Sequence, residues 1–132
     1  MDDALTPVRV ALVGNPNSGK TALFNALTGA HQKVANYAGV TVERKEGHVR
    51  TLSGRTLSVL DLPGTYSLRA RSPDEVVTRD AVLGRLEGET APDVIVCVAD
   101  ATNLRLHLRL ELELMAVGRP MVLALNMYDI AQ

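Results

Sequence analysis

The apolar segments of the chain alternate between short β-branched runs and stretches of helical composition. Two of the runs, at 94–99 and 121–125, are continuous and typical of parallel strands buried on both faces. Parallel neighbours need crossover connections of a dozen or more residues, usually helices. We therefore expect an α/β fold with a mostly parallel sheet and helices on both faces. The strands are expected at residues 8–13, 42–50, 57–60, 94–99 and 121–125.

Two of these strands are close enough in sequence to form a hairpin. Ser53 and Gly54 supply a turn between residues 42–50 and 57–60, which predicts an antiparallel pair at the edge of the sheet. The residues before this pair, 31–41, are polar and contain glycine. They are expected to form a loop.

Three segments predict helices. Residues 21–27 form the first, closed by Gly29. The second begins at Ser72-Pro73-Asp74-Glu75, where Ser72 caps the helix, Pro73 fits its first position and Glu75 completes a capping box. This helix is expected to reach about Leu86.

The third helical segment, from Leu104 to Met115, alternates leucine with charged residues and histidine, which by period alone predicts a strand. Leu, Arg and Glu are good helix formers, and the neighbouring strands need a crossover, so we expect a helix. Its apolar residues then form two stripes on nearly opposite sides. One stripe covers the sheet and the other needs a second cover. The stripes are Leu104, Leu108, Leu112 and Met115 on one side, and Leu106, Leu110 and Leu114 on the other.

Composition narrows the class of protein. The 132 residues are 46% hydrophobic and 22% charged with a net charge of -1, which suits one globular domain over residues 1–132 and excludes disorder. No run is long enough to span a membrane, and the balanced charge gives no broad field for nucleic acid. Cys97, the single cysteine, is expected to be a buried apolar filler. The three histidines, His31, His48 and His107, are expected at the surface.

A phosphate-binding loop follows the first strand. Residues Gly14-Asn15-Pro16-Asn17-Ser18-Gly19-Lys20-Thr21 match G-x-x-x-x-G-K-[ST] between a strand and a helix. Glycines let backbone N–H groups surround phosphates, and the helix N-terminus adds partial positive charge. Lys20 reaches the outer phosphates, and the Thr21 hydroxyl is suited to ligate Mg²⁺.

Three further motifs stand where such a site needs them. Asp61-Leu62-Pro63-Gly64 ends a strand, so Asp61 can hold Mg²⁺ through water and the Gly64 N–H can approach a terminal phosphate. Thr41 could close over Mg²⁺ and the γ-phosphate, or simply enter the next strand. Asn126-Met127-Tyr128-Asp129 has the N-x-x-D spacing that reads guanine: Asp129 accepts from the ring N–H and the exocyclic amine, and Asn126 ties this loop to the phosphate loop.

Together these motifs resemble the cytosolic N-terminal G domain of the ferrous iron transport protein B (FeoB) family, a Ras-like P-loop NTPase. The resemblance covers about Val8 to Asp129. It is carried by Gly-Asn-Pro-Asn-Ser-Gly-Lys-Thr at 14–21, Asn-Tyr-Ala-Gly-Val-Thr-Val-Glu-Arg-Lys at 36–45, Asp-Leu-Pro-Gly-Thr-Tyr-Ser-Leu at 61–68, Ser-Pro-Asp-Glu at 72–75, Asp-Ala-Thr-Asn-Leu at 100–104 and Ala-Leu-Asn-Met-Tyr-Asp at 124–129.

The resemblance implies a GTPase that uses Mg²⁺ and K⁺. Thr21 and Thr41 would ligate Mg²⁺ with help from Asp61, and Asn17 would hold K⁺ beside the phosphates, where its charge replaces an arginine finger. The loop through Thr41 would be the first switch and residues 64–71 the second. The residues expected in catalysis are Lys20, Thr41, Gly64 and Asn17. The residues expected to bind GTP or GDP are Gly14, Asn15, Pro16, Asn17, Ser18, Gly19, Lys20, Thr21, Ala22, Gly39, Val40, Thr41, Asp61, Leu62, Pro63, Gly64, Asn126, Met127 and Asp129.

Three features differ from many GTPases. Thr65 stands where Ras-like proteins have a water-orienting glutamine, so slow intrinsic hydrolysis is expected, and Met127 replaces the usual lysine of the guanine motif. The chain also stops at Gln132, before the last strand and helix of a G domain. We therefore expect a fragment of a transporter at the cytoplasmic face of the bacterial inner membrane, soluble and prone to self-association, whose partners are the protein's own helical regulatory and membrane domains.

Three functions are compared. The first is a GTP-hydrolysing switch that regulates Fe²⁺ uptake, with both switch loops ordered by Mg-GTP and released on hydrolysis. The second is a ribosome- or RNA-associated GTPase of the Era or Der type, which the net charge and the lack of a basic face disfavour. The third is a nucleotide sensor with negligible turnover, since no catalytic glutamine is present.

Overall fold

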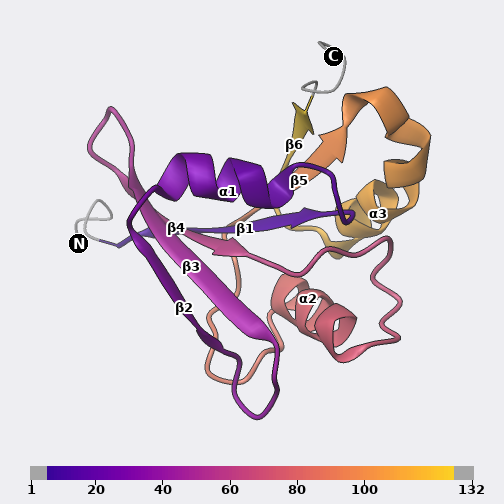
Figure 1. Cartoon of the computed structure of the whole chain (residues 1–132), viewed down its shortest axis with the longest axis horizontal. Coiled ribbons are helices and arrows are strands. Elements are labelled where there is room, and N and C mark those ends of the chain that lie inside the picture. The colour runs from indigo at the N-terminus through magenta and orange to yellow at the C-terminus, as the bar shows by residue number, and fades with distance from the viewer. Residues whose placement is uncertain (1–5, 127–132) are drawn as a thin grey trace.

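The computed structural model describes residues 6–126, whose elements follow the expected alternation (Figure 1). The strands are β1 (Val8–Gly14), β2 (Gln32–Asn36), β3 (Glu43–Arg50), β4 (Thr56–Asp61), β5 (Val94–Asp100) and β6 (Met121–Asn126). The helices are α1 (Lys20–Thr28), α2 (Pro73–Leu83) and α3 (Leu104–Val117), the last preceded by a 3-10 turn, η2 (Ala101–Asn103).

The six strands form one sheet in the order β2-β3-β4-β1-β5-β6. The four strands β4, β1, β5 and β6 are parallel, and β2 and β3 add an antiparallel edge. This confirms the α/β fold class and the β3–β4 hairpin. The expectation of a loop throughout 31–41 is wrong, because residues 32–36 form the edge strand β2, in which Gln32 pairs with Gly47 and Asn36 with Glu43.

Helices cover both faces of the sheet, as expected. Figure 1 shows α1 on one face and α2 and α3 on the other. Beneath α1, the ring of Phe24 packs with Leu12 and Val59. The larger core lies under α2 and α3, where Val82 and Leu110 meet strand residues such as Ile95. The parallel strands β1 and β5 therefore bury side chains on both faces.

The first turn of α2 has the predicted capping arrangement. The Glu75 N–H donates to the Ser72 hydroxyl at 3.3 Å, and the Glu75 carboxylate accepts from the Arg71 N–H at 2.9 Å. Hydrogen bonding by the Arg71 N–H lowers the pKa of Glu75. The helix ends at Leu83 rather than about Leu86, because Gly84 adopts a left-handed conformation with a φ of 75° that closes the last turn.

Residues 104–117 form a helix, and only one of its two apolar stripes reaches the core. Leu110 and Leu114 are fully buried against the sheet, whereas Leu106 is 48% exposed. The members of the opposite stripe are also exposed, at Leu104, Leu108, Leu112 and Met115. No described element covers this stripe.

Two predictions about single side chains have opposite outcomes. Cys97 is buried, as expected, and burial raises the pKa of its thiol to about 12, which suits an inert apolar filler. The expectation that all three histidines lie at the surface is wrong for His107, which is 2% exposed. Its Nε2 accepts a hydrogen bond from the Asp100 N–H at 3.2 Å, so the imidazole links α3 to the end of β5.

The last described strand, β6, lies at the edge of the sheet and pairs with β5. Val122, Leu123 and Leu125 are 54%, 42% and 49% exposed, so the expectation of burial on both faces is wrong there. The expectation of an open edge and face at this strand is confirmed. Among residues 6–126, no helix has the length and apolar content to cross a membrane.

Candidate functional site

The phosphate-loop motif connects β1 to α1 and has an unusual backbone. Asn17 has a positive φ of 68° and Gly19 one of 93°, conformations that turn successive N–H groups of such a loop inward. A Cβ atom on Gly19 would lie 1.9 Å from Nδ2 of Asn126. A glycine is therefore required at this position for both conformation and space.

Two asparagines, one outside the loop and one within it, tie the loop to neighbouring elements. Nδ2 of Asn126, at the end of β6, donates to the Ser18 carbonyl at 3.1 Å, which confirms the predicted tie between the guanine motif and the phosphate loop. Nδ2 of Asn15 donates to the Leu106 carbonyl in α3, also at 3.1 Å. Oδ1 of Asn15 and the Ser18 hydroxyl are buried without a hydrogen-bond partner among the described residues. The loop is thus tied to both β6 and α3.

Lys20 and Asp61 form a buried ion pair at the start of α1. Nζ of Lys20 bonds to Oδ1 of Asp61, and their side chains are 7% and 3% exposed. The Thr21 hydroxyl donates to Oδ2 of the same carboxylate at 3.3 Å. The ammonium of Lys20 is therefore paired with the Asp61 carboxylate. In a phosphate loop, the same ammonium is expected to bind phosphate oxygens.

Two cavities border Lys20, and a third lies beside the phosphate loop and the end of β6. The first, about 310 Å³, is lined by residues 15–22 and Gly64. The second, also about 310 Å³, lies between the Thr41 loop and the end of β4, with Lys20, Thr21, Thr41, Val42, Glu43, Lys45, Asp61, Leu62, Pro63, Gly64 and Asp74 around it. The third, about 640 Å³, is lined by Asn17, Gly19, Ala22, Leu23, Val98, Ala124, Leu125 and Asn126.

The second cavity gathers oxygen donors suited to Mg²⁺. Thr21, Thr41 and Asp61 border it, and hydroxyl and carboxylate oxygens of the kind that they carry fit that cation. The Asp61 carboxylate already lies within hydrogen-bond distance of the Thr21 hydroxyl. The expected magnesium residues thus border one space.

The Thr41 loop is anchored by a buried tyrosine. Tyr37 is 4% exposed and packs in the larger core, and its N–H donates to the Val42 carbonyl at 3.0 Å. Burial raises the pKa of this tyrosine, because a phenolate would lose its hydration there and lie near Glu89. Thr41 itself is exposed and borders the second cavity, next to the base of the loop that Tyr37 and Val42 fix.

The loop after β4 lies against the phosphate loop. A Cβ on Gly64 would be 3.0 Å from the Pro16 nitrogen, and the Thr65 N–H donates to the Gly14 carbonyl at 2.9 Å. The Thr65 hydroxyl donates to the Ser67 carbonyl at 2.7 Å, and the residue is buried. The Thr65 hydroxyl is therefore hydrogen-bonded within the loop itself. Gly64, the residue before it, lines the first two cavities.

Some of the predicted site residues do not line the cavities with an accessible side chain. Gly39 and Val40 are exposed and line none of these three cavities, whereas Leu62 lies in the lining of the second cavity but is fully buried. Met127 and Asp129, expected to read guanine, lie outside the described residues.

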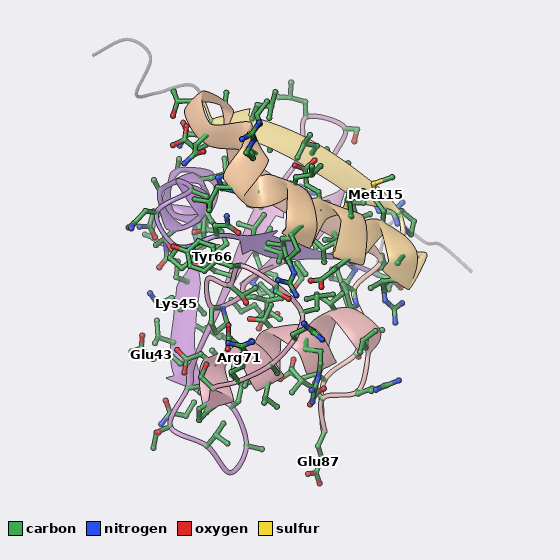
Figure 2. All side chains as sticks on the ribbon, turned by 90° about the vertical axis from the view of Figure 1, so that its right-hand side faces the viewer. Glu43, Lys45, Tyr66, Arg71, Glu87 and Met115 are labelled. Carbon is green, nitrogen blue, oxygen red and sulfur yellow. The ribbon has the colours of Figure 1, made fainter. Side chains whose placement is uncertain are left out.

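Three charged residues that were not among the predicted site residues also border the second cavity. They are Glu43, Lys45 and Asp74. Figure 2 shows Glu43 and Lys45 on β3, and Tyr66 and Arg71 on the loop that follows β4. Glu43 and Lys45 are two residues apart on a strand, so their side chains lie on the same face. This spacing could have indicated from the sequence that they border the same site.

A family model described as ferrous iron transport protein B matches residues 8–132. Among curated relatives, the Fe(2+) transport protein A/Fe(2+) transporter FeoB fusion protein of Porphyromonas gingivalis is 50% identical over 122 residues. The Fe(2+) transporter FeoB of Escherichia coli (strain K12) is 47% identical over 123 residues. These matches cover 92% and 93% of this chain but 14% and 16% of the relatives.

Solved structures agree with this similarity. The G domain of the T. maritima FeoB iron transporter superposes with a TM-score of 0.82 at 48% identity, covering 94% of this chain and 74% of that chain. A mutant of S. thermophilus NFeoB bound to mGDP gives a TM-score of 0.83 at 46% identity, covering 95% and 45%.

Proposed function

The chain belongs to the ferrous iron transport protein B family, and from this premise we propose that it is the GTP-binding and GTP-hydrolysing regulatory domain of a ferrous iron transporter. The observation that carries the proposal is the joining of a complete phosphate loop to Asn126, the first residue of the N-x-x-D motif, through the Ser18 carbonyl. A phosphate loop alone serves many nucleotides, whereas this pairing favours guanine nucleotides.

Nucleotide binding would exchange one partner of Lys20 for another. The phosphates of GTP carry more negative charge than one carboxylate, so the ammonium would move from Asp61 to the outer phosphates. The N-terminus of α1 and the N–H groups of the phosphate loop would bind the same anion. Structures of S. thermophilus NFeoB described as bound to GDP support this assignment.

Release of Asp61 from Lys20 would free its carboxylate for a cation. Thr21, Thr41 and Asp61 would then hold Mg²⁺, directly or through water, and the ion would neutralise charge that develops on the phosphates. Thr41 would contribute from its loop, which borders the second cavity. The loop would thus respond to the bound nucleotide while Tyr37 keeps its base in the core.

Hydrolysis would use the backbone and Asn17 rather than a glutamine. Water attacks the γ-phosphorus, the bond to the β–γ bridging oxygen breaks, and GDP and phosphate result. The Gly64 N–H would bond to the terminal phosphate, and the exposed Asn17 amide oxygen would hold K⁺ beside it. The Thr65 hydroxyl is bonded to the Ser67 carbonyl, so no side chain at this position orients the water, which favours a slow intrinsic rate of hydrolysis.

The proposed setting is a larger membrane protein. The curated relatives named above are transporters of which this chain matches about one sixth or less. The domain would act at the cytoplasmic face of the bacterial inner membrane, and its partners would be the helical regulatory and membrane domains of the same transporter. An RNA-associated GTPase is less well supported, because the net charge is -1.

Nucleotide titrations test the guanine assignment. GTP and GDP should bind the chain more tightly than ATP, and Asp129→Asn should lose GTP affinity and gain affinity for xanthosine nucleotides. Lys20→Ala should weaken every nucleotide. Equal affinity of the unsubstituted chain for ATP and GTP would contradict the assignment.

Single-turnover hydrolysis, on this chain and on the full-length transporter, tests the enzymatic part. The rate should rise in K⁺ relative to Na⁺, and Asn17→Ala should lose that rise while GDP affinity changes little. Equal rates in the two salts would remove K⁺ from the proposal. Absence of turnover with normal GTP binding would instead favour a nucleotide sensor. This alternative is worth testing because the Thr65 hydroxyl is bonded to the Ser67 carbonyl and not directed to an attacking water.

A further inference from the structure

A carboxylate on α3 holds the loop that follows β4. The Leu68 N–H donates to Oε1 of Glu113 at 2.6 Å, and the Ser67 hydroxyl donates to Oε2 at 3.2 Å. Nε of Arg109, one turn earlier on α3, lies 3.7 Å from the same Oε2. The Glu113 side chain is 28% exposed, so these bonds are partly shielded from water. Both oxygens of one side chain are thus engaged by the loop.

The other end of the same short segment is fixed to the phosphate loop. The Thr65 N–H bonds to the Gly14 carbonyl at 2.9 Å, and the Thr65 hydroxyl bonds to the Ser67 carbonyl at 2.7 Å. Only Tyr66 separates these two residues along the chain. Gly64 therefore adjoins a segment whose backbone is held by the phosphate loop at one end and by Glu113 at the other.

Gly64 depends on such support because it has no side chain with which to hold itself. It lies between the end of β4 and a loop without regular structure, close to the Pro16 backbone. Fixing backbone of this kind costs about 1–2 kcal/mol per residue in conformational entropy, which hydrogen bonds to a charged acceptor help to offset. The position of the Gly64 N–H then follows from where Ser67 and Leu68 are held.

Building on the proposed function, we propose that Glu113 is a positioning residue for GTP hydrolysis. By accepting from Leu68 and Ser67, it fixes the loop so that the Gly64 N–H meets the terminal phosphate in one orientation. Glu113 would contact neither the nucleotide nor the attacking water. Its effect passes through the loop backbone.

This role makes a specific kinetic prediction, because only GTP has the phosphate that Gly64 would contact. Loss of Glu113 should slow hydrolysis and leave GDP affinity unchanged. A glutamine at this position keeps an amide oxygen for the Leu68 N–H and an NH₂ group that can donate to the Ser67 hydroxyl oxygen. Glu113→Gln should therefore restore most of what Glu113→Ala loses.

Glu113 also allows a cleaner test than Glu75, the carboxylate on α2 that accepts hydrogen bonds from the same loop. Glu75 bonds to the Arg71 N–H but is part of the cap of α2, so its loss would damage a helix as well. Glu113 lies inside α3, where alanine is a good helix former. The side chain of Glu111, on the same helix, makes no hydrogen bond or ion pair with any described residue, and this residue serves as the control.

The experiment compares single-turnover GTP hydrolysis and GDP affinity in the unsubstituted chain, Glu113→Ala, Glu113→Gln and Glu111→Ala. We expect the rate of Glu113→Ala to fall about tenfold, Glu113→Gln to stay within about twofold and Glu111→Ala to match the parent. GDP affinity should be the same in all four. An unchanged rate in Glu113→Ala, no rescue by glutamine, or a parallel loss of GDP affinity would each overturn the proposal.

A second readout separates this inference from the proposed function. The sequence has no tryptophan, and Tyr66, between the two fixed points, is 47% exposed. Tyr66→Trp then reports on the loop when a non-hydrolysable GTP analogue is added. The fluorescence change should be lost with Glu113→Ala and kept with Glu113→Gln, even if the parent does not hydrolyse GTP. A parent without turnover contradicts the enzyme, whereas an unaltered signal in Glu113→Ala contradicts the role of Glu113.

Discussion

Gly19 is the residue at which backbone conformation and packing most sharply restrict the site. A left-handed conformation costs a residue with a Cβ about 1–2 kcal/mol, and here the Cβ would also collide with the Asn126 amide. Gly19→Ala should therefore weaken GDP binding at least about tenfold and lower thermal stability. Isothermal titration and thermal unfolding measure the two effects.

The matched control for this substitution is Gly54→Ala in the β3–β4 turn. Gly54 has a φ of 88°, close to that of Gly19, but no atom lies within 4 Å of its added Cβ. It should lose only the conformational part of the stability and keep GDP affinity. If Gly19→Ala behaves like Gly54→Ala, the contact with Asn126 does not constrain the loop.

His107 gives the chain a predicted weakness in acid. Burial lowers the pKa of its imidazole below 6.5, an effect that Asp100 and Glu111 partly oppose. As the pH falls below 6.5, His107 is therefore protonated in the unfolded chain before it is protonated in the folded chain. The free energy of unfolding then decreases until the pH reaches the lowered pKa of His107 in the folded state. His107→Gln should flatten this part of the profile, measured by urea unfolding. An unchanged profile would show that other groups control acid stability.

Sequence reasoning succeeded at residues whose role is local. Lys20, Thr21 and Asp61 follow from short motifs that fix their place at the ends of strands and helices, and the structure brings these three together. The burial of His107 and the contacts of Glu113 were missed, because both depend on how α3 is rotated against the sheet and on a distant loop. Alternating leucines and charges gave no signal for that rotation.

At the level of elements, one face of α3 is expected to contribute most of the stability that this helix provides. Leu110 is fully buried, whereas Leu112, two residues later, is 56% exposed. Leu110→Ala should lower the free energy of unfolding by about 2–5 kcal/mol, and Leu112→Ala by less than about 0.5 kcal/mol. Chemical denaturation of the two variants measures the difference. Equal losses would mean that the helix is rotated or that its outer stripe is covered.

The strand β2 shows the limit of pattern reading for elements. Its residues from Lys33 to Asn36 are all exposed, so no alternation of apolar and polar side chains marks them. The strand exists because its backbone completes hydrogen bonds with β3. In contrast, β1 and β5 bury side chains on both faces and were predicted almost to the residue, since burial selects their apolar runs.

For the whole molecule, exposed apolar residues predict association. One group lies on α3 at Leu104, Leu108, Leu112 and Met115, and a second on β6 at Val122, Leu123 and Leu125. Contiguous surfaces of this kind recruit partners. We expect this chain to self-associate at micromolar concentration, as seen by light scattering.

Two double variants identify the surface responsible. Leu108→Gln with Leu112→Gln alters α3, and Val122→Thr with Leu123→Thr alters β6. One of the pairs should lower the apparent mass, and the pair that does so marks the contact. A monodisperse monomer in the unsubstituted chain would contradict the prediction.

The bond between Asn126 and Ser18 joins residues 108 positions apart. Translation proceeds from the N-terminus, so a nascent chain exposes its phosphate loop long before β6 leaves the ribosome. Until then the loop lacks its tie to β6, and β5 has only β1 as a neighbour. The capacity to bind a nucleotide should consequently arise late in synthesis and abruptly, which would keep incomplete chains from capturing GTP.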